Sequence, residues 1–410
     1  MHLRKFRRLS FSACVGAIAV ITAACGSSST SGPAATVPSG LTVNSFDVNF
    51  TVMATLKDLH SAGSGLVGVI LPDTTSSVRY VNFDAPYLKK AFEAAGFSDS
   101  EFKIDNAQGN DATELAQAQA DITQGAKVLI MDPLDSTVGT QIQQAAAAKG
   151  VKVISYDRAT FTGNKTYYVS FNNVNVGKLI GQGFLDCVKA WNVSSPQVFT
   201  LNGGEDTDPN AIDFAKGYNQ VVWGEAVPQE TVGKSANGLT LVGDEVAPGW
   251  DNTKGQTIFQ QKYTANPKIN ATIEANDGLA NAVVTVLKQK GVGAGKIPTV
   301  GQDATLQGIE NILQGYQCGT VYKAVYLEAQ AAVALATILR AGLEPPSALV
   351  NGTTAPASGK PGNTQPAVLL TPLWVDKSKV ASTVIKDNFV DKNALCQAVT
   401  QKVCTDNGIT

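Results

Sequence analysis

Histidine is almost missing from this sequence of 410 residues, which contains only His2 and His60. This scarcity argues against a zinc site built on histidine and against a Ser-His-Asp triad. An excess of positive charge is missing too, because 32 Lys and Arg stand against 34 Asp and Glu. The formal charge of −2 therefore gives no indication of nucleic-acid binding. Aromatic residues amount to only 7%, but hydrophobic residues reach 44%, so a sizeable core can form.

The start of the chain lacks an apolar run long enough to span a membrane as a helix, which takes roughly 20 residues. Four basic residues come first, and the apolar run that follows covers only residues 11–21. Small residues then precede Cys25, as in a bacterial lipoprotein signal, whose cysteine is acylated. We expect residues 1–24 to be removed, Cys25 to carry lipid, and residues 25–48 to form a tether. The exported protein would then be anchored to the outer face of the cytoplasmic membrane; the alternative is an ordinary secretory signal with a chance cysteine.

Only four cysteines remain for the folded protein if the signal is removed and Cys25 is acylated. Export implies an oxidising compartment, in which disulfides form. No two of these cysteines have CxxC spacing, so a thiolate metal site is not expected. Four cysteines allow three pairings, and we favour Cys396–Cys404, which lie close in the sequence, together with Cys187–Cys318. Both disulfides would be structural.

Short apolar segments alternate regularly with helical patterns along most of the chain. A first series runs from a strand expected at residues 66–71 to one at 167–171, and a second from 197–201 to 320–322. Strands separated by helices of this length indicate βαβ units and parallel sheets, so the sequence predicts an α/β fold in two halves of five or six strands. Residues 345–366 are expected to form a loop, followed by a last strand over 368–372 and terminal helices.

Polar side chains tend to follow the expected strands. The β-branched run that starts at Val151 ends in Asp157 and Arg158, a carboxylate beside a planar fork of donors. In open parallel sheets, ligands bind beyond the carboxyl ends of the strands, although a surface ion pair is the alternative here. Further candidates after other strands are Arg79, Tyr80, Asp208, Asn210, Trp250, Asn276, Asp303 and Lys323.

This set of side chains suits a neutral polyol. Planar Asp, Asn and Arg groups can hold adjacent hydroxyls in pairs, and bonds to ionised groups are the stronger ones. The apolar faces of a sugar can stack on rings such as Trp250 and Tyr80. The alternatives are structural, since Asp and Asn after strands also cap helices, aromatic rings pack in loops, and Lys323 could be solvated.

Eight short motifs occur in the same order as in a known family. The sequence resembles the sugar-binding type 1 periplasmic binding proteins of ABC importers, and most of all their xylose-binding members, from about residue 66 to 395. The motifs are Gly68–Asp73, Tyr156–Arg158, Val169–Asn173, Val242–Asp244, Ala275–Gly278, Gly301–Ala304, Thr320–Lys323 and Leu370–Pro372.

The resemblance implies two doubly wound parallel-sheet lobes joined by a three-strand hinge. An N-terminal lobe would comprise residues 49–172 plus 321–370, and a C-terminal lobe residues 173–320 plus 371–410. The implied function is a lipid-anchored receptor that captures a monosaccharide, D-xylose or a similar aldose, in the cleft and delivers it to ABC permease subunits. Such a protein would be a monomer without cofactor, metal or enzymatic activity.

Carried over by position, the resemblance assigns Arg79 and the Asp157–Arg158 pair to the wall of the first lobe. The same carry-over makes ligands of Asp208, Asn210, Trp250, Asn276, Asp303 and Lys323. The sequence departs from the family in three places: Tyr80 replaces a Trp, the segment 205–210 is altered, and 345–366 is an insertion. The C-terminal cysteine pair is also additional. These departures weaken the pentose assignment more than the sugar assignment.

Three competing functions follow from the same residues. Related ligand-binding folds occur in repressors behind a helix-turn-helix, but here an export signal takes that place. An exported sugar-processing enzyme would need an acid pair, metal motif or nucleophile motif, and spacing in this sequence certifies none of them. The third alternative keeps the receptor and changes its ligand to another pentose, a hexose or a signalling molecule.

Overall fold

The computed structural model describes residues 35–162, 166–204, 208–225, 232–356 and 360–410. All of them belong to one compact unit, residues 35–410. Cys25 and the expected signal over residues 1–24 lie outside the described residues. So does the first part of the expected tether.

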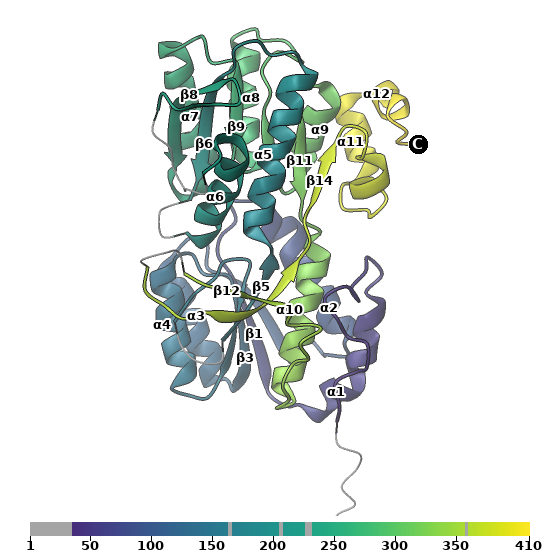
Figure 1. Ribbon diagram of the computed structural model, residues 1–410. Coiled ribbons are helices and arrows are strands. Elements are labelled where there is room, and N and C mark those ends of the chain that lie inside the picture. The colour runs from purple at the N-terminus through teal and green to yellow at the C-terminus, as the bar shows by residue number, and fades with distance from the viewer. Residues whose placement is uncertain (1–34, 163–165, 205–207, 226–231, 357–359) are drawn as a thin grey trace, which may run out of the picture. The chain divides into compact units, whose positions relative to one another are not determined.

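A seven-stranded sheet with the order β12-β13-β5-β4-β3-β1-β2 forms the first half of the fold, which we call lobe 1 (Figure 1). All its neighbouring strands are parallel except the β12–β13 pair. Its strands are β1 (Leu66–Leu71), β2 (Phe102–Asn106), β3 (Ala126–Met131), β4 (Lys152–Tyr156), β5 (Thr166–Phe171), β12 (Gly352–Thr354) and β13 (Gln365–Leu370). The expectation of a plain loop over 345–366 is therefore wrong in part, because this segment contains β12.

Helices cover both faces of this sheet because its strands are apolar on both sides. In β3, Val128 and Ile130 belong to one core and Leu129 and Met131 to another, as the two-residue period of a strand requires. The first core also takes in helices α2 (Ala85–Ala94) and α10 (Val325–Arg340), with η1 (Thr51–Leu56) and α1 (Lys57–Ala62) beside them. The second core takes in helices α3 (Asp111–Thr123) and α4 (Ser136–Ala147).

The second half, lobe 2, is built on two smaller sheets with the orders β7-β8-β6-β9 and β10-β11-β14. The strands are β6 (Gln197–Gly203), β7 (Ser235–Ala236), β8 (Leu239–Ala247), β9 (Ala271–Glu274), β10 (Val300–Gln302), β11 (Gly319–Tyr322) and β14 (Leu373–Asp376). The helices are α5 (Asn173–Ala190), α6 (Pro209–Trp223), α7 (Asn252–Ala265), α8 (Asp277–Gln289) and α9 (Leu306–Gln314), with the turn η3 (Pro248–Trp250). The strands of this half thus form two sheets, and β7 and β14 were not predicted.

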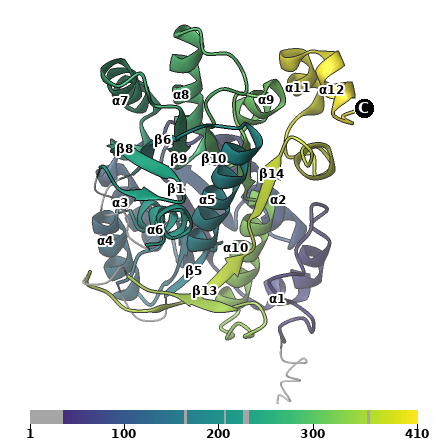
Figure 2. The same cartoon turned by 45° about the horizontal axis from the view of Figure 1, so that its top comes forward.

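Helices α5 and α6 lie closely side by side, an approach that depends on two glycines (Figure 2). A Cβ atom on Gly177 would lie 2.1 Å from the carbonyl oxygen of Phe214. A Cβ on Gly217 would lie 2.3 Å from the carbonyl oxygen of Val174. Because backbone atoms cannot yield as a flexible side chain can, only glycine permits this packing.

The chain passes between the two lobes three times, after β5, after β11 and after β13. These crossings bring the carboxyl ends of the lobe 1 strands close to lobe 2. The C-terminal residues then form η4 (Ala381–Ile385), α11 (Lys392–Val399) and α12 (Gln401–Asp406). Both favoured disulfides, Cys187–Cys318 and Cys396–Cys404, are present. The predicted two-lobed, doubly wound α/β fold is confirmed, while the residue limits given for each lobe stay a proposal.

Candidate ligand-binding site

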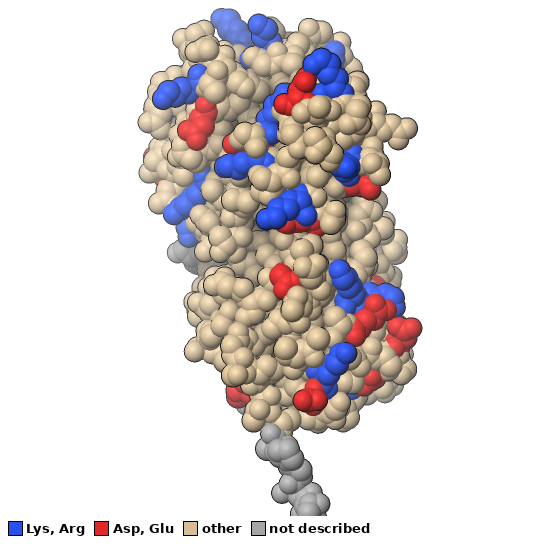
Figure 3. Space-filling model, turned by 90° about the vertical axis from the view of Figure 1, so that its right-hand side faces the viewer, with Lys and Arg blue, Asp and Glu red and all other residues tan. Residues whose placement is uncertain are grey.

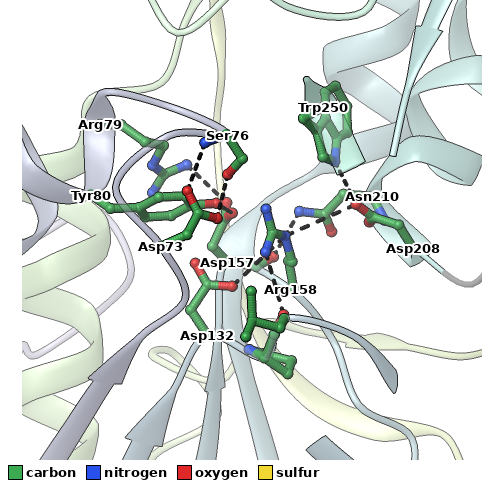
Figure 4. Close-up of polar contacts among 12 residues, drawn as sticks. Asp73, Ser76, Arg79, Tyr80, Asp132, Asp157, Arg158, Asp208, Asn210 and Trp250 are labelled. Atoms are coloured by element: carbon green, nitrogen blue, oxygen red, sulfur yellow. Dashed lines mark hydrogen bonds and ion pairs between the residues drawn. The ribbon is translucent and has the colours of Figure 1, made fainter. Parts of the chain in front are cut away.

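All ten side chains predicted to bind a ligand line one pocket at which both lobes meet. Figure 4 shows Arg79, Tyr80, Asp157, Arg158, Asp208, Asn210 and Trp250 among them. Lobe 1 supplies some of them from the turn after β1 and from the end of β4, and lobe 2 supplies others from the ends of β6, β8, β9 and β10. The ten are Arg79, Tyr80, Asp157, Arg158, Asp208, Asn210, Trp250, Asn276, Asp303 and Lys323. The strand-end rule, that ligand-binding side chains follow the carboxyl ends of parallel strands, therefore identified residues that do lie together. Their role as ligands remains a prediction.

Asp157 is the charged centre of the lobe 1 wall. Arg79 donates from Nη1 to its Oδ1 over 2.8 Å, Tyr80 donates to its Oδ2 over 3.3 Å, and the Lys323 ammonium lies 3.9 Å away. Burial acts against the charge, but Arg79, Lys323 and Arg158 together hold the pKa of Asp157 below its usual value. The carboxylate is therefore ionised and acts as an acceptor at neutral pH.

Arg79 lies behind Asp157 and serves mainly to position it. Four of its five N–H donors bind carboxylates: two bind Asp84, one binds Glu328 at 2.7 Å, and one binds Asp157. Burial lowers the pKa of Arg79, yet Asp157, Asp84 and Glu328 raise it well above the ordinary value. The same burial raises the pKa of Glu328 to about 8 in spite of Arg79. Arg79 thus forms a buried ion cluster whose free donor capacity is small.

Arg158 is the opposite case, a buried guanidinium with few close partners among the described residues. Its Nη1 donates to the carbonyl oxygen of Pro133 over a long 3.4 Å, and its Nε lies 3.9 Å from Asp132 and 4.0 Å from Asp208. Its Cζ lies 5.6 Å from the ring centre of Tyr80. Asp157 and Arg158 are only 4% and 8% exposed, so the alternative of a surface ion pair is wrong.

The lobe 2 wall is built from two helix caps and a tryptophan. Asp208 caps α6 through Oδ1, and its Oδ2 accepts from the indole Nε1 of Trp250 at 2.7 Å. Asn276 caps α8 by accepting from the backbone N–H of Leu279, and it also lines the pocket. The capping alternative therefore holds for both residues, and it coexists with their place in the pocket. Trp250 fits here because Gly203 lacks a Cβ, which would lie 2.0 Å from the indole ring.

Three pocket residues have unusual backbone angles. The φ angles of Asp157, Trp250 and Asp303 are 57°, 59° and 95°, in the region that side chains other than glycine rarely adopt. Such conformations cost on the order of 1–3 kcal/mol each and persist where function or packing requires them. Three of them in one pocket support the interpretation that this is the functional site. Asp303 also pairs with Lys323 at 3.0 Å.

The two walls touch each other in this structure. Asn210 donates from Nδ2 to the backbone oxygen of Asp157 at 3.1 Å, and its Oδ1 accepts from Asn173 at 2.8 Å. The cavity between the walls is only about 30 Å³, room for water molecules rather than for a sugar ring. Side chains or lobes must therefore move apart before a ligand of that size can enter.

Size alone would not have located this pocket. A hollow of about 810 Å³ lies between α4, α6 and the segment that follows β12, and none of the ten residues lines it. A smaller cavity of about 110 Å³ adjoins the pocket beyond Arg158 and shares Asp208 and Trp250 with it. The pocket is distinguished by converging charges and rings and by its strained backbone, and these features also mark binding sites in other proteins.

Sequence reasoning missed several residues of the site. Ser76, Ser77, Phe214 and Gln302 also line the pocket. Gln302 ends β10 beside Asp303, so the strand-end rule could have found it. Glu328 carries no local signal, because it lies on a long apolar helix and contacts Arg79 across 249 residues of sequence. Among the described residues, no group of three or more His, Cys, Asp or Glu is arranged to hold a metal ion.

Comparison with known proteins gives concordant results. Residues 67–344 match the family described as periplasmic binding protein domain. The D-xylose-binding periplasmic protein of Escherichia coli (strain K12) is 33% identical over 295 residues, 71% of this chain and 82% of that protein. The multiple sugar-binding periplasmic receptor ChvE of Rhizobium radiobacter is 29% identical, over 82% of this chain and 93% of that protein.

A solved structure agrees in fold as well as in sequence. The carbohydrate transporter solute-binding protein of Chloroflexus aurantiacus, in complex with D-glucose, aligns with a TM-score of 0.68 and 25% identity. The alignment covers 81% of this chain and 98% of that one. The two-lobed architecture described above is therefore shared by a protein whose structure contains a bound sugar.

Proposed function

The chain belongs to the periplasmic binding protein domain family, and from this premise we propose that it is a receptor for a monosaccharide. The sugar would be captured between the two lobes and delivered to an ABC importer without chemical change. The observation that carries this proposal is Arg158, a buried cation with one long hydrogen bond to the residues that the structure describes, opposite Trp250 and Asp208 in a pocket shared by both lobes.

A sugar supplies the partners that this pocket leaves open. Its hydroxyls can accept from Arg158, donate to Asp157 and Asp303, and bind the amide of Asn276. Its apolar face can lie against Trp250, which is held in place by Asp208. Because every hydroxyl that meets a buried polar group must be present, such a site selects sharply among sugars.

The ligand proposed is D-xylose or a similar aldose in its ring form. The relative from Escherichia coli is named for D-xylose, the relative from Rhizobium radiobacter for several sugars, and the Chloroflexus aurantiacus structure contains D-glucose. Tyr80 stands where the xylose-binding members have a tryptophan, so a hexose is the second candidate. Entry requires opening of the lobes at the three crossings, a hinge motion.

The proposal for the cellular location rests on the sequence alone. We propose that residues 1–24 are removed, that Cys25 carries the lipid, and that the receptor stays as a monomer at the outer face of the cytoplasmic membrane. No helix within the described part of the chain is long and apolar enough to cross a membrane.

Tryptophan fluorescence tests the proposal directly. The protein is titrated with a panel of pentoses and hexoses while chromatography follows the amount of each sugar. We expect a saturable change at micromolar or lower sugar and no consumption, and a Trp250→Phe variant, which keeps the other three tryptophans, should lose most of the signal. Absence of a response to every sugar would overturn the receptor, and consumption of a sugar would favour an enzyme.

A further inference from the structure

The C-terminal residues after β14 form a segment of their own, residues 377–410, beyond the residues that match the family. It consists of η4, α11 and α12, and the disulfide Cys396–Cys404 joins its last two helices. Figure 1 shows it in yellow beside α9 of lobe 2. The proposed sugar pocket does not include this segment, so its role requires a separate explanation.

The segment is attached to lobe 2. It follows β14, which pairs with β11, and its helices pack against α9. Lys377 donates from Nζ to the backbone oxygen of Leu313 on α9 at 2.9 Å. Leu395 and Val399 of α11 lie in a packed core that includes Ile312 of α9 and also residues of lobe 1. This attachment means that the segment should move with lobe 2 when the lobes rotate.

The same segment also reaches lobe 1 through Phe389. Its ring stacks on Phe83 of lobe 1, with 4.1 Å between ring centres and 14° between planes. On the lobe 2 side, the Phe389 ring meets Tyr322 edge-on at 4.8 Å. Phe83 lies a few residues after Arg79 and Tyr80 and lines the hollow that leads to the proposed sugar pocket.

Asp387 makes a second link across the hinge. Its Oδ2 accepts from the hydroxyl of Tyr322 at 3.2 Å and from that of Tyr326 at 3.0 Å. Tyr322 ends β11 in lobe 2, and Tyr326 begins α10 in lobe 1, so the crossing between lobes lies between them. Rotation at this crossing must change the distance between the two hydroxyls. Basic and acidic side chains are interspersed on this side of the molecule (Figure 3).

We propose that residues 377–410 act as a clasp that holds the two lobes together, with Asp387 and Phe389 as positioning residues for sugar capture. This inference rests on the proposed function. The stack on Phe83 and the bond from Tyr326 form with lobe 1 in the arrangement described, in which the pocket walls touch. Contacts made only in that arrangement of the lobes raise its population. A bound sugar gains its room by movement of pocket side chains while the lobes keep this arrangement, so ligand affinity rises with the population that the clasp supports.

Two variants on lobe 1 test the clasp without touching the pocket polar groups. Phe83→Ala removes the stack, and since Phe83 is only half-buried, the fold should tolerate the change. Tyr326→Phe removes one hydroxyl and nothing else. We expect the Kd of Phe83→Ala to rise roughly three- to tenfold, equally for every sugar bound, with faster dissociation. Tyr326→Phe should also raise the Kd. Phe83→Trp keeps an aromatic ring at this position, so its Kd should return towards that of the wild type.

The control is Tyr263→Ala, which removes a half-buried ring that stacks within lobe 2 on Phe259. It should lower thermal stability but leave every Kd unchanged. Small-angle X-ray scattering of sugar-free protein supplies an independent readout: Phe83→Ala should increase the radius of gyration, and Tyr263→Ala should not.

The outcomes separate the clasp from the function on which it rests. An unchanged Kd in Phe83→Ala and Tyr326→Phe overturns the clasp, and so does a change in the ranking of sugars, which would mean that the pocket itself was altered. If the wild-type protein binds no sugar, the proposed function fails. The clasp is then tested by small-angle X-ray scattering alone. An unchanged radius of gyration in both Phe83→Ala and Tyr326→Phe then overturns the clasp, and an increased radius of gyration in both variants supports it.

Discussion

At the scale of single residues, the two arginines of the pocket have opposite roles. Arg158→Ala should weaken sugar binding by roughly 100-fold or more, because charged hydrogen bonds to a ligand are worth about 1.5–3 kcal/mol each. The melting temperature should stay within a few degrees. Arg158 makes one long hydrogen bond in the described structure, and burial raises the pKa of its neighbour Asp132, which can therefore remain neutral without it. Titration and thermal unfolding of the same preparation measure both quantities.

Arg79→Ala is the matched contrast for this prediction. It leaves Asp84, Asp157 and Glu328 buried without their common partner, a change that typically costs about 3–5 kcal/mol. Its loss of stability should therefore be large, while Arg158→Ala unfolds like the wild type. Full sugar affinity in Arg158→Ala would mean that this guanidinium is only structural.

This difference between the arginines marks the limit of prediction from sequence at this scale. Polar residues after parallel strands must gather at one edge of a sheet, so their convergence could be predicted without a structure. The different roles of Arg79 and Arg158 could not be predicted, because they depend on Glu328 and Asp84. No strand end places these two acids near Arg79. Capping was predicted only as a general alternative for Asp and Asn after strands, and in Asp208 and Asn276 the structure combines capping with a place in the pocket.

At the scale of elements, β9 contains a buried acid whose ionisation should oppose folding. Glu274 is fully buried, accepts from the backbone N–H of Val300 at 2.9 Å, and burial raises its pKa to about 8 from an ordinary 4.5. The folded protein therefore holds this proton where the unfolded chain has lost it. Stability from this group is present below about pH 4.5 and is lost as the pH rises towards 8.

Glu274→Gln should remove this pH dependence. Between pH 5 and pH 8, the free energy of unfolding of the wild type should fall relative to that of the variant by about 1–4 kcal/mol. Urea denaturation at both pH values measures the difference, and other buried acids such as Glu114 cancel because both proteins contain them. Glu93→Gln, on the exposed side of α2, serves as control. Parallel pH profiles for Glu274→Gln and the wild type would mean that Glu274 is ionised in the fold.

Elements were predictable where their own sequence defines them. The long helices and the central strands of lobe 1 follow from apolar period and length. Strands β7 and β14 were missed because β7 has only two residues and β14 is defined by its pairing with β11. The same reason explains β12, a three-residue edge strand inside a segment rich in Gly, Pro, Ser and Thr. Partner strands, and not the local pattern, decide such elements.

At the scale of the whole molecule, the resemblance to the family implied three crossings between two lobes but not how closely the walls would meet. The cavity of about 30 Å³ results from contacts such as Asn210 with Asp157, which join segments from different lobes. Such contacts depend on the angle between lobes, a quantity that no local pattern encodes. A receptor of this kind should therefore be understood as an equilibrium between lobe arrangements, which ligand and clasp both bias.

Lobe 2 itself should depend more on one disulfide than on the other. Cys187–Cys318 closes a loop of 131 residues between α5 and the start of β11, whereas Cys396–Cys404 closes one of 8. A cross-link destabilises the unfolded chain more when its loop is longer, and the chain-entropy estimate for these two loops differs by about 2–3 kcal/mol. The double variant Cys187→Ser, Cys318→Ser should thus lose more stability than Cys396→Ser, Cys404→Ser.

Each double variant replaces two sulfurs with two hydroxyls, so the pair is matched in chemistry and differs in loop length. Chemical denaturation with both proteins fully oxidised measures the two losses, and the first should exceed the second by a margin of that order. A larger loss from the Cys396–Cys404 pair would mean that packing of the C-terminal segment, and not chain entropy, dominates. That result would also show that the clasp contributes to the stability of the whole receptor, since α11 and α12 share their core with lobe 1.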